Sequence, residues 1–257
     1  MRRPAAMAMG VQERWATCGE AMTGNFEDEL SNFMGPTLWS SDLAIFAVHD
    51  ANNGSHMDML HATPLCMGIA HERDNVYWTF NGHVGAIDRY DFNADHGPGM
   101  HDHSDGSVSR YVQGQVTRVP GVPSHMEFRK QDGQLYIADT GNGRVVKLDT
   151  QSGTPSGNLT PVYEPLADAS NIQGAVLTEF LAPGLLEQPS GLAWHDDVLF
   201  VTDHATSLIH AFGPDGTLLR SLDTGLPTGT LGGITFGPDN RLYFANMRTG
   251  SIHRIDP

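Results

Sequence analysis

The sequence predicts an all-β protein in which four-stranded sheets repeat along the chain as the blades of a β-propeller. Three observations support this prediction. Four segments carry the same residue types at the same spacing, and each type suits a turn or a strand. The 257 residues include 29 glycines and 15 prolines, which is typical of a turn-rich β protein. That length is sufficient for one large domain with its own core.

The repeat begins with an Asp and has an aromatic residue four positions later. An Asp or Asn follows after three more positions, and an Ile or Val after another six. A weaker copy, with Asp42, Phe46 and His49 at the first three positions, precedes the four clear ones. The clear copies are Asp74, Trp78, Asn81, Ile87; Asp132, Tyr136, Asp139, Val145; Asp196, Phe200, Asp203, Ile209; and Asp239, Tyr243, Asn246, Ile252.

Each position of the repeat has a physical reason. The first Asp stands among Gly, Asn and Asp residues, where its side chain can close a tight turn. The aromatic residue lies in short alternating segments such as LYIAD, which predict a strand with one buried face. The second Asp or Asn ends that strand, and the Ile or Val begins the next one. With an earlier strand such as SGLAW or GGITF, each copy gives three visible strands and a less regular fourth.

The spacing of the copies sets the expected organisation. Asn81, Asp139, Asp203 and Asn246 are 58, 64 and 43 residues apart, which predicts insertions near residues 93–108 and 151–180. We expect a propeller over 36–257, preceded by an N-terminal segment, 1–35, that is a closing strand or the remnant of a further blade. The count is five or six blades. The clear blades span about 64–120, 121–185, 186–228 and 229–257.

The last blade stops after its third strand, so we expect a strand around residues 11–17 to complete it and remove the open edge. Any helix should lie within residues 20–35 or 165–180.

Charge and hydropathy limit the partners and the compartment. The net charge of −15 opposes binding to phosphate backbones, so we expect no nucleic-acid partner. No apolar run approaches the roughly 20 residues that span a bilayer. The start lacks the apolar stretch of a standard signal peptide. We therefore expect an extracytoplasmic or secreted protein if the natural N-terminus is missing, and a cytoplasmic one otherwise.

The segment GQLYIADTGNGRVVKLD, residues 133–149, resembles the NHL repeat, and the resemblance extends over roughly residues 64–257. It implies a propeller of four-stranded blades. NHL propellers include both protein-binding scaffolds and enzymes. One enzyme branch, the peptidyl-hydroxyglycine α-amidating lyases, places histidines from Pro-(x)-His motifs around a zinc ion in the central channel. Pro123-Ser124-His125 resembles that motif, whereas Gly68, Gly191 and Gly233 occupy the equivalent positions of the other clear blades.

The repeat predicts where the histidines lie. His61, His83, His125 and His204 fall in loops that share one face of a propeller, with His125 nearest the axis. We therefore take His125, His61 and His204 as candidate metal ligands of this channel face. His125 with Arg144 is the best catalytic candidate. The other interpretation is that His125 only hydrogen-bonds a carbonyl of the neighbouring blade.

A second set of candidate ligands is local. The insertion DFNADHGPGMHDHSDG contains closely spaced imidazoles and carboxylates, which can surround zinc, copper or calcium. Met100 would add a soft ligand for copper, although a loop of this composition is more often a solvated acidic turn. A third group, His56, Met57, Met59 and His61 beside Cys66 and Met67, suggests copper or simple core filling. The candidate metal ligands of the opposite-face loop are His71, His96, His101, His103, Asp102 and Asp105.

The two cysteines, Cys18 and Cys66, are either a disulfide or two buried thiols. No phosphate-binding glycine loop, nucleophile elbow or HExxH motif is present, so we expect no nucleotide cofactor. Three functions remain. One is a metal-associated propeller acting as a lyase or hydrolase on a small molecule or peptide, with its pocket on the His125 face. The second is a non-catalytic propeller that binds a protein or a carbohydrate. The third is a structural or metal-sequestering role that rests on the His/Asp-rich loop alone.

Overall fold

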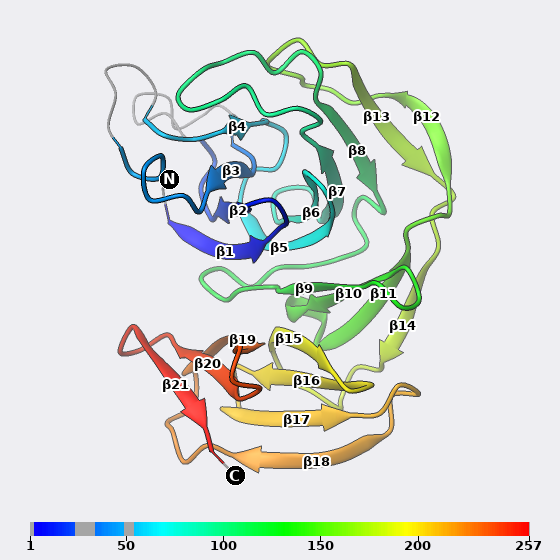
Figure 1. The fold of residues 1–257 in the computed structure, drawn as a ribbon. Coiled ribbons are helices and arrows are strands. Elements are labelled where there is room, and N and C mark those ends of the chain that lie inside the picture. Colours follow the sequence, from blue (N-terminus) through cyan, green and yellow to red (C-terminus); the bar gives the residue numbers. More distant parts are fainter. Residues whose placement is uncertain (1–2, 24–33, 49–53, 257) are drawn as a thin grey trace. The chain divides into compact units, whose positions relative to one another are not determined.

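The computed structural model describes residues 3–23, 34–48 and 54–256, and in these residues the protein is an all-β fold of the β-propeller class. The strands form five sheets, each built around neighbouring antiparallel strands that follow one another in the chain (Figure 1). The described residues fall into two compact units. Met1–Gln115 with Ser152–Ala175 form unit 1, and Val116–Gln151 with Val176–Pro257 form unit 2.

Unit 1 contains two sheets. The first has the order β1-β2-β3-β4, and the second has the order β12-β13-β8-β7-β6-β5. Four strands of the second sheet, β5 to β8, form an antiparallel meander. The strands of this unit are β1 (Pro4–Met9), β2 (Arg14–Gly19), β3 (Thr37–Ser40), β4 (Asp58–Met59), β5 (Cys66–Arg73), β6 (Val76–Asn81), β7 (Ala86–Asp91), β8 (Ser107–Tyr111), β12 (Thr154–Asn158) and β13 (Asp168–Gln173).

Unit 2 contains three sheets, with the orders β14-β11-β10-β9, β15-β16-β17-β18 and β19-β20-β21. Its helical structure, within the described residues, is the 3₁₀ turn η1 (Thr140–Asn142). The strands are β9 (Met126–Arg129), β10 (Gln134–Asp139), β11 (Arg144–Asp149), β14 (Leu177–Leu181), β15 (Pro189–His195), β16 (Val198–Asp203), β17 (Leu208–Phe212), β18 (Leu218–Asp223), β19 (Leu231–Phe236), β20 (Leu242–Asn246) and β21 (Ser251–Ile255).

The second acidic or amide position of the repeat ends the same strand in four sheets. Asn81, Asp139, Asp203 and Asn246 are the last residues of β6, β10, β16 and β20. In three of them the side chain accepts backbone N–H groups two and three residues later, as Asn81 Oδ1 does from His83 and Val84. These bonds close the turn into the next strand. The repeat is therefore a turn-capping pattern.

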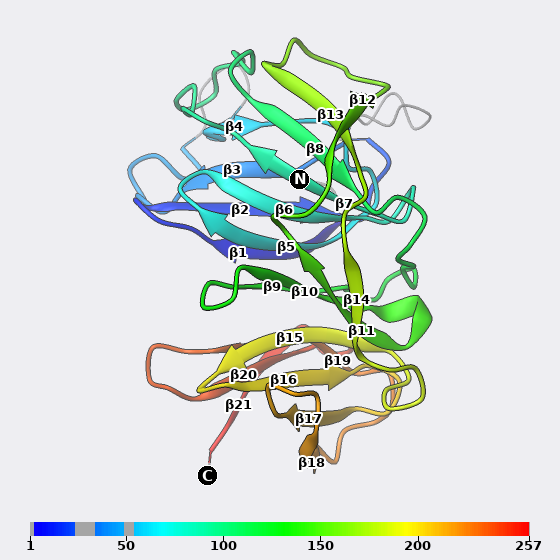
Figure 2. The same ribbon diagram turned by 90° about the vertical axis from the view of Figure 1, so that its right-hand side faces the viewer.

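The insertion between β11 and β14 pairs with a different sheet from the one that contains β11 and β14. Its strands β12 and β13 pair with each other, and β13 runs parallel to β8 with Asp168 opposite Ser107 and Asn171 opposite Arg110. Figure 2 shows β13 and β12 beside β8 at the edge of that sheet. Residues 152–175 thereby cover an edge strand that would otherwise expose its backbone groups.

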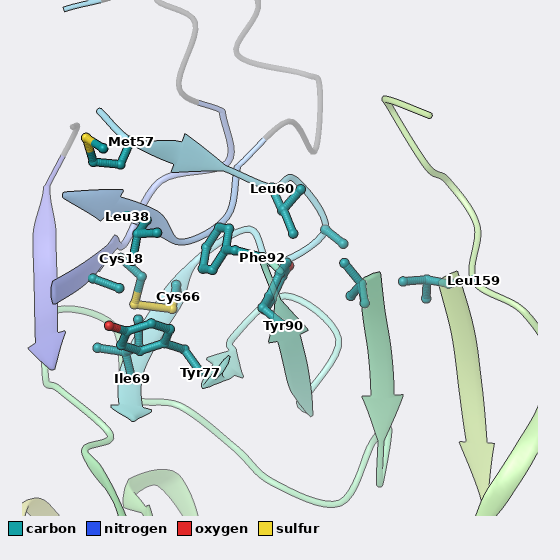
Figure 3. Packing of buried hydrophobic residues seen from close by; sticks show 13 residues of the cluster. Cys18, Leu38, Met57, Leu60, Cys66, Ile69, Tyr77, Tyr90, Phe92 and Leu159 are labelled. Atoms are coloured by element: carbon teal, nitrogen blue, oxygen red, sulfur yellow. A yellow bond between two sulfur atoms is a disulfide. The ribbon is translucent and has the colours of Figure 1, made fainter. Parts of the chain in front are cut away.

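The core of unit 1 surrounds a disulfide. Cys18 of β2 and Cys66 of β5 are joined, with their Cα atoms 5.7 Å apart, so the disulfide considered from the sequence is present in the structure. Leu38, Ile69 and Tyr77 belong to the same buried cluster (Figure 3). Both sulfur-bearing residues are fully buried. The disulfide thus links two sheets of this unit through its apolar centre.

The strand pairing contradicts the expectation that an N-terminal strand completes the last blade. The segment expected to pair with the last blade, residues 11–17, forms the turn after β1 and the first part of β2, and β2 pairs with β1 and β3 instead. The last sheet has three strands, β19 to β21, in the part of the chain described. The turn at residues 10–14, where Gly10 N donates to Arg14 O, brings β1 back onto β2. The sequence permitted a helix within residues 165–180, but this region contains the strand at residues 168–173 and most of the strand at residues 177–181. Most of the other region where a helix was expected, residues 24–33, lies outside the described part.

Candidate metal site

Three segments of unit 1 bring imidazole and carboxylate groups together. The first is the chain around β4, with His56, Asp58 and His61. The second is the loop between β7 and β8, with His96 and His103. The third is the insertion, which supplies Glu164 between β12 and β13. Nearly all of these side chains are buried, and the most exposed, His103, has 11% of its side chain accessible.

The first group consists of His56, His96 and His103. One ring nitrogen from each lies within 4.8 Å of the others, which is close enough for a single ion to bind all three. The ring centroids of His56 and His96 are 5.1 Å apart, and those of His96 and His103 are 5.3 Å apart. His96 Nδ1 donates to the carbonyl of Gly97 at 2.7 Å, so Nε2 carries the lone pair in the neutral ring.

The Nε2 atoms of His96 and His103 are both buried, and neither has a hydrogen-bond partner in the described residues. Burial lowers the pKa of His96, so its ring is neutral near pH 7. A buried nitrogen lone pair without a donor costs free energy. A metal ion bound to these atoms would remove that cost, because neutral imidazole is a common metal ligand.

Glu164 orients two of the imidazoles. Its Oε2 accepts from His61 Nδ1 at 2.5 Å and lies 3.8 Å from His103 Nδ1, while its Oε1 accepts the backbone N–H of His61 at 2.8 Å. Burial opposes its charge, but the neighbouring imidazoles of His103 and His61 lower the pKa of Glu164 to about 2. The nearby Glu164 carboxylate raises the pKa of His103, although burial works in the opposite direction. A carboxylate behind a ligand imidazole fixes its tautomer and increases its basicity.

Asp58 adds a buried carboxyl group to the cluster. Its Oδ1 lies 3.9 Å from His96 Nε2 and accepts the backbone N–H of Met59 at 2.7 Å. Burial raises the pKa of Asp58 to about 7, although the bond from Met59 works in the opposite direction. An ionised Asp58 would balance the charge of a nearby cation, because a buried carboxylate needs a partner.

The acidic residues of the 92–106 loop serve mainly to hold the loop in place. Asp95 accepts from Arg14 Nε at 2.9 Å. Asp105 accepts from Asn93 and Ala94, and Asp102 accepts from Ser104. Within the described residues, two groups of three side chains could hold an ion, the one above and a second of His61, His103 and Glu164, and neither contains Asp102 or Asp105. The cluster is thus rich in nitrogen, which favours zinc or copper over calcium.

The residues expected on the channel face are placed as follows. His125, just before β9, donates from Nδ1 to Leu192 O at 2.9 Å, and His204 donates from Nδ1 to Leu231 O at 2.7 Å. Each imidazole thus bonds to the inner strand of the next sheet of unit 2, which is the structural interpretation weighed for His125. Burial lowers the pKa of His125. Arg144 Nε pairs with Asp139 at 2.7 Å.

Neither His125 nor His204 belongs to a three-ligand group among the described residues, whereas His61 lies with His103 and Glu164.

The remaining loop candidates, His71 and His101, belong to neither three-ligand group among the described residues. His71 is bonded to Asp74 O at 3.0 Å within the β5–β6 turn, and His101 is exposed, as is Met100 at 56%. Asp58 and Glu164 were not candidates from the sequence, and His56 entered only with the methionine-rich group. The His-x-Asp spacing of His56 and Asp58 was the available signal, since alternate residues share one side of an extended chain.

Comparisons with known proteins support the fold class and no narrower group. No family model matches the chain, and no curated protein matches it. Among solved structures, virginiamycin B lyase from Staphylococcus aureus is similar with a TM-score of 0.57 and 13% identity, covering 99% of this chain and 70% of that one. A nidogen/laminin complex is similar with a TM-score of 0.57 and 12% identity, and the match covers 98% of this chain and 75% of that one. A streptogramin B lyase has a TM-score of 0.48 and 19% identity. That match covers 74% of this chain and about half (51%) of the lyase chain.

At these identities the likeness concerns the fold alone. The resemblance to NHL repeats and to amidating lyases therefore stays a prediction from the repeat. In the described residues, no helix has the length and apolar character needed to span a membrane.

Proposed function

We propose that this protein binds a divalent transition-metal ion, zinc in the first place, through His56, His96 and His103. The observation that carries the proposal is the pair of buried, unpartnered Nε2 atoms of His96 and His103 within one three-imidazole group. Glu164 acts behind the ligands, and Asp58 supplies negative charge beside them.

Three nitrogen ligands leave a fourth position on a tetrahedral zinc ion. An ion of this kind polarises a carbonyl group or lowers the pKa of a bound water. The class of activity that we propose is therefore a metal-dependent lyase or hydrolase acting on a small molecule or peptide. The alternative, a non-catalytic propeller that binds a protein or a carbohydrate, is supported by a separate cavity in unit 1.

The disulfide between Cys18 and Cys66 bears on the compartment, because such bonds persist in oxidising environments. We propose that the protein works outside the cytoplasm.

The test is elemental analysis of protein purified without added metal, followed by Co²⁺ titration of the metal-free form. We expect one ion per chain and the visible absorption bands of tetrahedral Co²⁺. His96→Ala and His103→Ala should lose the bands and bind the ion at least tenfold more weakly. His125→Ala is the matched control and should keep full metal content, since its ring bonds to Leu192. Wild-type protein that takes up no Zn²⁺ or Co²⁺, or equal affinity in all variants, would refute the proposal.

A further inference from the structure

A second candidate site is a cavity of about 290 Å³ in unit 1. Ala62, Arg110 and Leu159 lie at buried positions of its lining, and Gln113, Tyr163 and Asn171 are more exposed. The insertion between β11 and β14 therefore contributes part of the wall. The volume suits a ligand no larger than about one sugar ring, at the lower end of ordinary ligand pockets.

Arg110 supplies hydrogen-bond donors to the lining of the cavity. Its side chain is only 8% exposed. Nε and Nη2 donate to Asp88, at 2.7 and 2.9 Å, and Nη2 also donates to Ala62 O at 2.6 Å. No hydrogen bond involves Nη1 in the described part of the chain. Two N–H groups of a buried guanidinium are thus available to a ligand in the cavity that Arg110 lines.

The charge of Arg110 is already balanced. Asp88 is fully buried and also accepts from Thr63 at 2.6 Å and from Asn81 at 2.8 Å, so the pair belongs to a fixed network. The burial of both groups makes this pairing obligatory, since either charge alone would be costly. The cavity therefore offers strong N–H donors without net positive charge, and the protein's net charge of −15 further opposes an anion.

The more exposed lining residues add amide groups and an aromatic ring to the cavity. Gln113 carries an amide group that can both donate and accept, and Asn171, whose Nδ2 already donates to Asn158 O at 2.9 Å, keeps an accepting Oδ1. Tyr163, 37% exposed, offers an aromatic ring with a polar end. Amides and an arginine N–H beside an aromatic ring suit the hydroxyl oxygens and apolar ring face of a sugar. We propose that this cavity binds a neutral sugar of monosaccharide size, with Arg110 Nη1 donating to a hydroxyl oxygen.

The experiment is a ligand-observed NMR titration with glucose, galactose, mannose and N-acetylglucosamine, and with glucuronate as the anionic counterpart. At least one neutral sugar should give saturable transfer that glucuronate does not match. Gln113→Ala should weaken its binding about tenfold, the effect of one lost hydrogen bond. Gln173→Ala, an exposed glutamine on β13 outside the lining, is the matched control and should bind as the wild type does.

Arg110→Lys keeps a cation beside Asp88 but removes the planar fork, so it should also lose binding while retaining its circular-dichroism spectrum. Saturation by none of the neutral sugars, binding of glucuronate alone, or equal affinity in Gln113→Ala and Gln173→Ala would each overturn the proposal. The titration needs no metal, so its failure is separate from a failure of the metal proposal.

Discussion

Reduction of the Cys18–Cys66 disulfide should destabilise unit 1 by an amount that follows from its loop. The two residues are 48 positions apart, and the chain-entropy relation for a loop of that length gives about 4 kcal/mol at 25 °C. The bond closes this loop between β2 and β5 in the centre of the core, so the unfolded chain gains the freedom that the cross-link removes.

The measurement is urea unfolding of the oxidised and the reduced wild-type protein, followed by tryptophan fluorescence. Trp15, Trp39 and Trp78 lie in unit 1 and report on it. Reduction keeps both sulfur atoms, so it isolates the cross-link. The Cys18→Ala/Cys66→Ala variant should lose more, because it also removes buried atoms from a packed site. If reduction changes the free energy of unfolding by less than about 1 kcal/mol, the loop-closure argument fails for this protein.

Three further predictions concern other parts of the molecule. Burial raises the pKa of Glu127 to about 7, so the folded state holds its proton more tightly than the unfolded state. The free energy of unfolding should therefore fall as pH rises from about 4.5 to 7. Thermal melts at several pH values should show that Glu127→Gln reduces this fall by on the order of 1 kcal/mol. An identical fall in both proteins would contradict the reasoning. Gly191→Ala should cost about 1–3 kcal/mol in urea unfolding, because its Cβ would lie 2.7 Å from Gly232 O, whereas Gly233→Ala meets open space and should cost less than about 0.5 kcal/mol. Chelation should lower the melting temperature in calorimetry, since an ion at a hundred times its Kd stabilises the native state by about 2.7 kcal/mol; an unchanged melting temperature would count against the metal site.

The repeat allowed the strands to be predicted because its positions act locally. Asn81 and Asn246 cap turns within three residues of themselves, and such short-range hydrogen bonds leave a visible pattern in the sequence. The same locality explains why a residue 58 or 64 positions away could be assigned to the equivalent strand end.

The candidate metal site was only partly predictable because it is not local. His96 and His103 belong to one loop and were grouped from the sequence, but His61 was assigned with His125 from its position relative to the repeat. The partner of His61 is Glu164, 103 residues later, on an insertion that leaves its own sheet. No spacing or periodicity connects two residues at that separation, so only the folded chain reveals the contact.

The insertion also determines which fragments of this protein can be studied alone. The chain passes from unit 1 to unit 2 after Gln115, returns at Ser152 and leaves again after Ala175. A fragment of residues 1–115 would therefore lack Glu164, lose the exposed wall contributed by Tyr163, and present β8 as an open edge. Neither unit is a continuous stretch of sequence, so circular permutation or internal joining across residues 115–152 would be needed to isolate unit 1.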